Sequence, residues 1–425
     1  MTKFQRPRGT RDFPPEQMQK WRYVEGVLRD VAEKFGFGEV VTPTFESTEL
    51  FIERSGEAIV DEMYAFKDKG GRDIALRPEL TAPVMRYYVN ELSSRPKPLK
   101  LYYFGNVFRY ERPQSGRFRE FYQFGAELIG APSMDSDAEI IALALACLKS
   151  VGLENIVVRV GHLGILDTVL EELGVPGDLN DACRRFIDKK DPEGLETLLS
   201  EYGIDYDNLE KLIEIINTTG GRSAITKVQE MVDEVDENFI YLSNLLKKLS
   251  RYGFDNCVVD FGVARGLDYY TGMVFEIDSP TLGAEKQICG GGAYKLAELF
   301  GGDEVNSTGF AFGFDRLMLA MENEGCEVPS QQLKAYVIPL SQATRSTALE
   351  ILKALRENGI SADTDLMGRK ISKALAYADS VKAKRAILVG EKELVEDSVT
   401  VRDMRSGEQT LVRIKDLPAE LTDDD

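Results

Sequence analysis

Four arginines lie close together in the segment FRYERPQSGRFREF, residues 108–121. They are Arg109, Arg112, Arg117 and Arg119. The chain that contains them has a formal net charge of −19. Guanidinium groups this close repel one another unless an anion lies among them, and the glutamates of the segment offset only part of the charge. The segment therefore predicts a site for an anionic ligand.

Other residue types that do chemistry are scarce. The chain has one histidine, His162, and five cysteines without a CxxC pair. This composition leaves few routes to a Ser-His-Asp, Cys-His or His-rich metal site, and we expect no structural zinc and no other protein-bound metal site. His162 ends an apolar strand and is expected to be structural. An enzyme of this composition would act by positioning and by arginine and glutamate electrostatics, which favours phosphoryl or nucleotidyl transfer.

Three glycine-bearing segments add possible chemistry: ARGLDYYTG (264–272), CGGGAY (289–294) and GFAFGFDR (309–316). None is a P-loop, since no GK[ST] follows, and none fits GxGxxG opening a helix. Taken singly, each is better explained by structure: tight turns for the glycines, core aromatics for the tyrosines and a surface position for the arginine.

The whole chain has the composition of a soluble globular protein. It has 425 residues, of which 43% are hydrophobic and 29% charged, so we expect two to four domains. The polar start does not resemble a secretory signal, and the longest apolar run, Ile140–Leu148, is too short to span a bilayer. Dispersed cysteines favour a reducing compartment. We expect a cytoplasmic protein without a membrane partner.

The elements that must position these residues follow from periodicity and turn signals. Helices are expected at Gln17–Phe35, Leu80–Glu91 and Asp137–Val151. Strands are expected at Glu39–Thr42, Ile74–Leu76, Leu99–Phe108, Arg119–Leu128, Val157–Gly161, Cys257–Phe261, Met273–Ile277 and Phe310–Gly313. Leu99–Phe108 and Arg119–Leu128 should form a long antiparallel hairpin, which places the arginines on its loop and at the adjoining strand ends.

The succession of strand-like and helix-like segments along the chain predicts an α/β protein with an α+β catalytic core. The core would comprise residues 1–167 and 250–326, interrupted by a helical insertion at 168–249. After ENEGCEVPSQQ the pattern becomes β-α-α-β-β, so residues 327–425 should form a small α/β domain with its own sheet. The expected elements there are Ala335–Pro339, Ala348–Glu357, Ser372–Ser380, Ala386–Val389 and Val399–Asp403.

The order of these segments resembles the class II aminoacyl-tRNA synthetases, and specifically the histidyl-tRNA synthetase family. Phe35–Glu46, Phe108–Glu127 and Gly309–Met321 are similar to the three class motifs. The signatures typical of the histidine enzyme are RGLDYYTG (265–272) and the CxGGxY pattern of 289–294, supported by PRGTRDF (7–13) and LRPELT (76–81). The resemblance implies an antiparallel sheet flanked by helices, a helical insertion and a C-terminal anticodon-binding domain.

The resemblance also implies how ATP is held. The ATP-binding residues would be Arg109, Arg117 and Arg316, with Arg109 at the α-phosphate and Arg316 at the γ-phosphate. Arg265 would lie beside the α-phosphate and be catalytic together with Arg109. Mg²⁺ would accompany ATP. Planar guanidinium groups suit bidentate phosphate contacts.

Histidine recognition is implied in the same way. Glu79, Thr81 and Gln123 would hold the α-amino group, and Glu127 and Tyr270 the two ring nitrogens. The remaining residues implied at the histidine site are Arg265, Tyr269 and Tyr294, the last closing the pocket. Gln123 and Glu127 lie four residues apart in a strand and so share one face. The family's usual form CxGGRYDxL is altered here, because Ala293 and Lys295 replace an arginine and an aspartate.

The implied macromolecular partner is tRNA(His). Arg112 and Gln114 on the hairpin loop would contact its acceptor end. In Gly368–Ala386, the basic residues implied to bind tRNA are Arg369, Lys373, Lys382, Lys384 and Arg385. A solvated helix face is the alternative interpretation of this basic cluster.

The function implied is that of a histidine–tRNA ligase. It would form histidyl-adenylate and pyrophosphate from L-histidine and ATP, then transfer histidine to the 3′ end of tRNA, as a homodimer with Pro43 at its interface. The alternative is a catalytically idle, synthetase-like regulatory subunit of histidine biosynthesis. A synthetase for another amino acid and an inactive RNA-binding scaffold are further alternatives.

Overall fold

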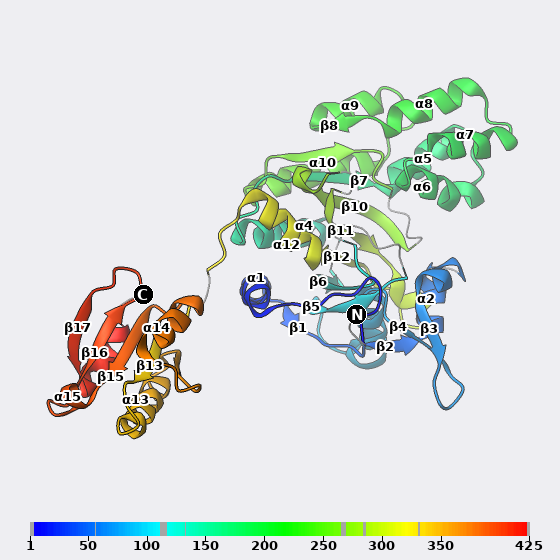
Figure 1. Cartoon of the computed structure of the whole chain (residues 1–425). Helices are drawn as coiled ribbons and strands as arrows, with labels where there is room; N and C mark the ends of the chain where they lie inside the picture. Colours follow the sequence, from blue (N-terminus) through cyan, green and yellow to red (C-terminus); the bar gives the residue numbers. More distant parts are fainter. Residues whose placement is uncertain are drawn as a thin grey trace. The chain divides into compact units, whose positions relative to one another are not determined.

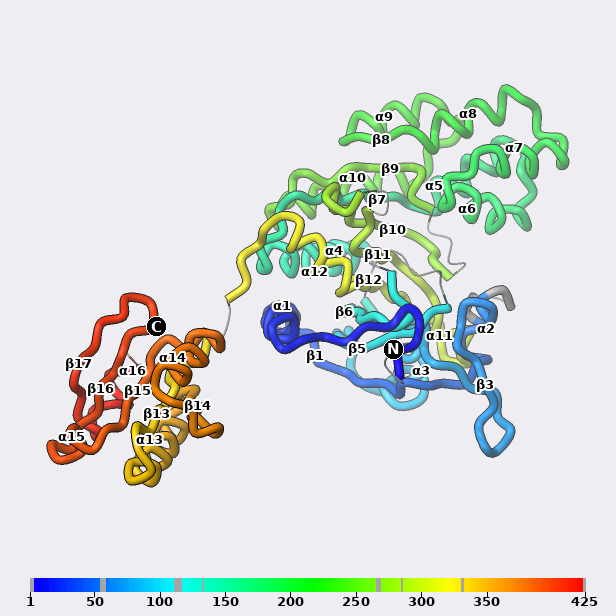
Figure 2. The backbone as a smooth tube through the Cα atoms, viewed as in Figure 1, coloured from blue at the N-terminus to red at the C-terminus, as the bar shows by residue number. Residues whose placement is uncertain are grey.

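The computed structural model describes residues 4–55, 57–110, 117–131, 133–264, 269–283, 286–329 and 332–422. Contacts divide the chain into two compact units, Met1–Val328 and Pro329–Asp425, which are considered separately (Figures 1 and 2). Among the described residues, no helix is both long and apolar enough to cross a membrane.

A mixed sheet forms the centre of the first unit. In the described part it has nine strands in the order β1-β5-β6-β12-β11-β10-β7-β9-β8. Neighbours are antiparallel except β1 with β5 and β7 with β9. The bounds in sheet order are β1 Gly38–Glu39, β5 Leu99–Phe108, β6 Glu120–Ile129, β12 Ser307–Gly313, β11 Gln287–Tyr294, β10 Tyr270–Asp278, β7 Val157–His162, β9 Cys257–Asp260 and β8 Thr219–Gly220. The expected antiparallel sheet is confirmed, apart from these two parallel pairs.

The predicted hairpin is strands β5 and β6. Their register runs without a break from Leu99 opposite Ile129 to Phe108 opposite Glu120. Gly125 is required at its centre, because a Cβ there would lie 2.5 Å from both the Tyr103 hydroxyl and the Phe310 carbonyl oxygen. This close approach lets a tyrosine from β5 reach across β6 toward β12.

Helices cover the sheet (Figure 1). Helix α4 (Ser133–Ser150) packs against β6, β11 and β12, and α1 (Pro15–Lys34) packs against α4. Proline at the first position of α1 suits a helix start, since its missing N–H would have no partner there. On α1, Trp21 packs among the rings of Phe13, Tyr122 and Phe314, with centroid distances of 4.8, 5.3 and 4.6 Å. Phe314 begins α12 (Phe314–Glu324).

A smaller antiparallel sheet lies beside the hairpin. In the described part it has three strands, in the order β2 (Phe45–Ser47), β4 (Asp73–Leu76) and β3 (Tyr64–Lys67). Its helical segments are α2 Thr48–Ser55, η1 Glu57–Glu62, α3 Thr81–Tyr87, η2 Tyr88–Leu92 and α11 Leu296–Leu299. The prediction of a strand over Glu39–Thr42 was too long, because only Gly38 and Glu39 pair with β5 before Pro43 interrupts the chain. The predicted helix Leu80–Glu91 is α3 followed by a π turn.

The chain between β7 and β9 is mainly helical, as expected. Its elements are α5 Leu163–Glu172, η3 Gly177–Leu179, α6 Asn180–Asp188, α7 Pro192–Glu201, α8 Tyr206–Ile216, β8, α9 Arg222–Gln229 and α10 Glu237–Arg251. Aspartates begin three of the helices, since the side chains of Asp191, Asp205 and Asp236 accept a backbone N–H of α7, α8 and α10 respectively. A short turn η4 (Pro280–Leu282) follows β10.

The second unit has its own sheet. Its described strands are ordered β14-β13-β15-β16-β17, with β13 parallel to β14 and β15 and the remaining pairs antiparallel. The strands are β13 Ala335–Pro339, β14 Ala362–Thr364, β15 Arg385–Val389, β16 Ser398–Asp403 and β17 Gln409–Arg413; the helices are α13 Arg345–Glu357, α14 Ile371–Ser380, α15 Glu391–Leu394, η5 Ile414–Asp416 and α16 Leu417–Thr422. The predicted C-terminal α/β domain is confirmed, and β14 and β17 extend its sheet beyond the predicted strands.

Candidate active site

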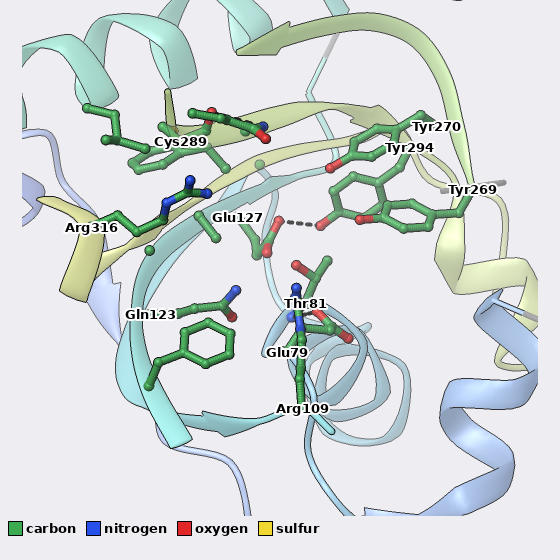
Figure 3. A pocket seen from close by; sticks show the side chains of 18 residues that line it. Glu79, Thr81, Arg109, Gln123, Glu127, Tyr269, Tyr270, Cys289, Tyr294 and Arg316 are labelled. Atoms are coloured by element: carbon green, nitrogen blue, oxygen red, sulfur yellow. Dashed lines mark hydrogen bonds between the residues drawn. The ribbon is translucent and has the colours of Figure 1, made fainter. Parts of the chain in front are cut away.

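One cavity brings together most of the residues implied by the motifs (Figure 3). It encloses about 180 Å³ between the hairpin, the LRPELT turn, β10 to β12 and the start of α12. Those implied residues that line it are Glu79, Thr81, Arg109, Gln123, Glu127, Tyr269, Tyr270, Tyr294 and Arg316. Arg117 is described but does not line this cavity. Arg112, Gln114 and Arg265 lie outside the described residues.

Glu127 provides a buried carboxylate at the cavity. Its side chain projects from β6, and the residue is 1% exposed. Oε1 accepts a hydrogen bond from the Tyr103 hydroxyl at 3.0 Å, and Oε2 accepts one from the Tyr294 hydroxyl at 2.6 Å. Burial raises the pKa of Glu127 to about 8, although the hydrogen bonds oppose this shift. The nearby Glu79 also raises it.

Gly309 makes room for this carboxylate. It lies opposite Glu127 in the β6–β12 register. A Cβ on Gly309 would lie 1.8 Å from Glu127 Oε2, so no larger residue fits without moving the carboxylate. Sequence reasoning found the GFAFG segment but missed this role and that of Tyr103, because both contacts cross between strands and leave no local signal.

Tyrosines form the wall on the side away from Arg316 (Figure 3). The rings of Tyr269 and Tyr270 stack with centroids 4.4 Å apart, and Tyr269 meets Tyr294 edge to face at 5.7 Å. All three residues are buried. Aromatic faces with hydroxyl groups at their edges suit a planar ring that carries its own hydrogen-bonding atoms.

The LRPELT turn holds a second carboxylate. Glu79 accepts hydrogen bonds from the backbone N–H groups of Thr81 at 2.5 Å and Ala82 at 2.9 Å, where α3 begins. A carboxylate has lone pairs beyond these two, so it can still receive a ligand ammonium. Gln123, 8% exposed, has an Oε1 with no hydrogen-bond partner among the described residues. These acceptors favour a cationic donor at this end of the cavity.

A buried arginine fixes that turn in place. Arg77 is 5% exposed, and its guanidinium donates to the carbonyl oxygens of Asn106 at 2.9 Å, Thr42 at 2.7 Å and Pro43 at 3.2 Å. Burial lowers the pKa of Arg77. One side chain thus joins the segment before β2, the hairpin strand β5 and the turn that carries Glu79.

Two arginines approach the cavity from different elements (Figure 3). Arg109 follows β5; its Nε donates to the Pro78 carbonyl oxygen at 2.9 Å, and its guanidinium lies 5.4 Å from the Phe121 ring centroid. Arg316 lies in the first turn of α12, whose N-cap Gly313 also lines the cavity. A helix N-terminus with an arginine beside it favours an anion such as phosphate.

The PRGTRDF segment supports the start of α12. Arg11 forms an ion pair with Asp315, whose other oxygen accepts the Tyr122 backbone N–H at 2.8 Å. The Arg11 guanidinium also lies 4.3 Å from the ring of Phe13 and 4.1 Å from that of Phe118. Burial lowers the pKa of Arg11 to about 10. The N-terminal segment therefore contributes structure next to Arg316 rather than a residue in the cavity lining.

The basic cluster of the second unit is partly neutralised. Arg369 pairs with Asp365 at 2.7 Å, and Arg385 pairs with Asp403. Lys373 and Lys382 are exposed, and Lys384 is half-buried. Next to Arg369 the apolar side chains of Leu366 and Met367 are 80% and 74% exposed, a feature that the charge pattern did not predict. The surface therefore combines positive charge with exposed apolar side chains.

Within the described ranges, no three His, Cys, Asp or Glu side chains come together as a metal site. Mg²⁺ in nucleotide enzymes is often held mainly by phosphates and water, with one or two carboxylates from the protein. The described residues do not define a resident metal site of their own.

Comparison with known proteins gives a consistent result across the chain. A family model described as Histidyl-tRNA synthetase matches residues 9–317, and one described as Anticodon binding domain matches residues 334–424. A histidine–tRNA ligase of Methanosarcina acetivorans is 48% identical over 417 residues, which cover 98% of each chain.

Solved structures agree with these matches. The crystal structure of apo S. aureus histidyl-tRNA synthetase has a TM-score of 0.74 at 30% identity, covering 98% of this chain and 99% of that one. A Bacillus halodurans protein described as an ATP phosphoribosyltransferase regulatory subunit/histidyl-tRNA synthetase has a TM-score of 0.78 at 27% identity, covering 91% and 98%.

Proposed function

The chain belongs to the histidyl-tRNA synthetase family, and on this premise we propose which of its residues carry out the reaction. It is a histidine–tRNA ligase, an ATP-dependent aminoacyl-tRNA ligase. The reaction has two steps. A carboxylate oxygen of histidine attacks the α-phosphorus of ATP and pyrophosphate leaves; then a hydroxyl of the terminal tRNA ribose attacks the acyl carbon and AMP leaves.

The observation that supports histidine as the substrate is the buried Glu127 with two tyrosine hydroxyls on its oxygens. In our proposal the imidazole lies against the tyrosine wall, with its nitrogens at Glu127 and Tyr270 and with Tyr294 closing the pocket. Glu79, Thr81 and Gln123 receive the α-ammonium group. A buried site of paired donors and acceptors rejects amino acids that leave those groups unsatisfied.

The proposed ATP site lies toward the two arginines. Arg109 binds the α-phosphate and, with Arg265, stabilises the charge that develops on it, while Arg316 at the start of α12 binds the γ-phosphate. Preorganised guanidinium groups aimed at developing charge lower the barrier without reorganisation during the reaction. Arg117 would act from the hairpin loop once ATP is bound. Mg²⁺ enters with ATP and would neutralise phosphate charge, and no step above depends on a metal held by the protein alone.

The second unit is proposed to bind the anticodon region of tRNA(His). Support comes from the match to an anticodon-binding domain over residues 334–424 and from the exposed lysines of the α14 region. Arg112 and Gln114 on the hairpin loop would contact the acceptor end. The proposed domains remain 1–167, 168–249, 250–326 and 327–425; the division into compact units after Val328 supports the last boundary.

We also propose a homodimer that works in the cytoplasm. Near Pro43, the side chains of Val41, Phe45 and Phe66 are 81%, 57% and 49% exposed, which supports burial of this face against a second copy. The described cysteines are free thiols, which supports a reducing compartment.

The decisive experiment is ATP–pyrophosphate exchange with each of the twenty amino acids in turn, followed by charging of tRNA(His). We expect exchange with histidine alone. The regulatory-subunit alternative predicts no exchange with any amino acid, and a ligase for another amino acid predicts exchange with that one. An inactive RNA-binding scaffold predicts tRNA binding without either activity. Retention of Arg109 and Arg316 at the cavity favours the ligase.

A further inference from the structure

A second cavity has a volume of about 810 Å³. It lies where strands β7 and β11 end, where β10 and β12 begin, and where α4 and α10 pack together. We call it the α4–α10 cavity. Its polar side chains used below are Asp137, His162, Glu237, Tyr241, Lys295 and Ser307. The volume is within the range typical of small-molecule sites. Among the described residues, Tyr294 alone lines both this cavity and the active-site cavity.

The α4–α10 cavity contains a buried carboxylate with an oxygen open to a ligand. Asp137 is 1% exposed; its Oδ2 accepts a hydrogen bond from the Tyr241 hydroxyl, while its Oδ1 has no partner among the described residues. Burial raises the pKa of Asp137 to about 6 against the opposing effect of the Tyr241 hydroxyl, so the group is ionised at pH 7.5. The Thr308 hydroxyl is near enough to lower this pKa as well, but neither its oxygen nor Asp137 Oδ1 has a partner with hydrogen-bond geometry among the described residues. A buried carboxylate oxygen without a donor costs free energy that a ligand can recover.

Two other atoms at the cavity also lack partners. They are Nδ1 of His162 and Oγ of Ser307, and neither has a hydrogen-bond partner among the described residues. Burial lowers the pKa of His162 to about 4, so its ring is neutral near pH 7 and does not repel a cation. The three polar atoms without partners therefore come from three separate elements, α4, β7 and β12, whose residues line one cavity.

The charged side chains of the cavity lining favour a cationic ligand over an anionic one. Among the described residues of the lining, Asp137 and Glu237 are the acidic side chains and Lys295 is the basic one. Lys295 already pairs with Glu304, so little positive charge remains for an anion. The rings of His162 and Tyr241 lie 5.1 Å apart at an interplanar angle of 60°. Aromatic faces beside a carboxylate suit a planar cation.

We propose that the α4–α10 cavity is a binding site for a small planar cation of the amidinium or guanidinium class, held by the free Oδ1 of Asp137. The ligand donates two N–H groups to the carboxylate and neighbouring acceptors, and its body occupies the space beside His162. The site is separate from the proposed histidine and ATP sites and does not depend on their assignment.

The test uses the full chain and benzamidine as the probe, with benzamide as the uncharged control of the same shape. Titration calorimetry at pH 7.5 should show saturable binding of benzamidine and at least tenfold weaker binding of benzamide. Asp137→Asn keeps the size of the side chain and an acceptor for Tyr241, and should weaken benzamidine binding by about tenfold to a hundredfold. Saturating histidine should not displace the probe.

Ala293→Arg is the second variant, independent of the first. Ala293 lines the cavity, and an arginine there would place its own guanidinium in the space, so benzamidine binding should be abolished and the melting temperature should not fall. This change restores the residue type of the usual signature. The proposal is overturned by any of three results: no saturable binding to the wild type, competition by histidine, or equal affinity for wild type and both variants.

Discussion

In the proposed histidine pocket, the burial of a single carboxylate affects both the stability of the protein and the binding of a ligand. Glu127 is an acid whose pKa is raised to about 8 by burial, and Glu79 nearby adds to the shift. Below pH 8 the empty site therefore holds a proton on Glu127 that must leave before the carboxylate can accept an imidazole N–H or bind a cation. The polar groups specify the ligand, and their burial sets the pH at which they act.

Glu127→Gln should remove this dependence. In the wild type, kcat/KM for histidine in pyrophosphate exchange should rise about fivefold from pH 7 to pH 8, because the ionised fraction of a group with a pKa of about 8 rises from about one tenth to one half over this range. The glutamine variant should show a much higher KM for histidine, an unchanged KM for ATP, and no such rise. Deprotonation of free histidine affects both enzymes alike, so the ratio of the two profiles isolates Glu127. Equal increases in the two KM values would make Glu127 structural.

The same substitution has a predicted effect on stability. An unfolded glutamate titrates near 4.5 and folded Glu127 near 8, so between these values the folded state binds more protons. The wild type must therefore lose stability through this group as pH rises from 4.5 to 8. Glutamine does not titrate, so the melting temperature of the variant relative to wild type should increase from pH 5 to pH 8. A constant difference would contradict the raised pKa.

Gly309→Ala tests the space that Glu127 occupies. A Cβ at this position would lie 1.8 Å from Glu127 Oε2 and 2.7 Å from the Ala126 carbonyl oxygen, so the carboxylate must move and the strands must part slightly. We expect histidine KM to rise at least tenfold and stability to fall by about 1–3 kcal/mol. Gly26→Ala on α1, where a Cβ meets nothing within 4 Å, is the control. It should leave histidine KM unchanged and should not lower stability, since alanine favours a helix interior over glycine. Normal histidine KM in Gly309→Ala would contradict the geometry.

At the scale of elements, the cavity depends on a turn held by Arg77. This side chain joins the segment before β2 to β5 and lies directly before the turn that carries Glu79 and Thr81. Gly105 faces it, and a Cβ there would lie 2.6 Å from Arg77 Nη2. Hydrogen bonds from Arg77 to backbone carbonyl oxygens thus hold together three segments: the one before β2, strand β5 and the turn with Glu79.

Arg77→Lys should loosen this junction. Lysine has one nitrogen and cannot reach the carbonyl oxygens of Asn106 and Thr42 together, so we expect stability to fall by about 3 kcal/mol in urea denaturation followed by circular dichroism. Pyrophosphate exchange should fall as the turn loses its position. Arg72→Lys is the control, since its ion pair with Asp68 is exposed. If both lysine variants unfolded at the same urea concentration, the junction would carry no special stability.

Several elements could be predicted from sequence because their signals are local. The bounds of β5 and β13 match the expected strands, and the hairpin follows from two strand patterns flanking a Pro- and Gly-bearing loop. Strand β11 was not expected, because three consecutive glycines in CGGGAY are unfavourable in strands. Its glycines are explained only by neighbours: Cβ atoms on Gly291 and Gly292 would lie 2.3 and 2.5 Å from carbonyl oxygens of the adjacent strands.

The candidate site likewise contains residues that could be predicted from local sequence and residues that could not. The residues that share the cavity were named from a resemblance in motif order, whereas the hydroxyl of Tyr103 and the missing side chain of Gly309 emerge only from strand register. Likewise, the charge pattern found the basic cluster of residues 368–386 but not the carboxylates that neutralise it. Asp403 reaches Arg385 across the β15–β16 register, whereas Asp365 lies only four residues before Arg369, just outside the segment 368–386.

At the scale of the whole molecule, a chain of net charge −19 must bind a polyanion. Local potential decides such binding. In our proposal the lysines of the basic cluster contribute more to it than Arg369 and Arg385, whose charge is offset by Asp365 and Asp403. In the same proposal, the apolar side chains beside them contact bases once the phosphates have positioned the strand.

Replacing Lys373, Lys382 and Lys384 together by alanine should reduce tRNA(His) charging while leaving histidine-dependent pyrophosphate exchange unchanged. The slope of log affinity for tRNA against log salt should fall by about one for each phosphate that the variant no longer neutralises. Arg385→Ala is the comparison, and its slope should change less because Asp403 already offsets its charge. A wild-type slope and normal charging in the triple variant would identify the lysines as a solvated face.

Because of Trp21, tryptophan fluorescence reports on the first unit and not on the second. It is the one tryptophan of the sequence, and it lies in the first unit among Phe13, Tyr122 and Phe314, the last of which precedes Arg316 by two residues. All tryptophan fluorescence of the native protein therefore arises from this packing site, and the second unit contributes none. Indole emission reports unfolding of the first unit alone, whereas circular dichroism reports both. The offset between the two melting curves measures how independently residues 329–425 unfold.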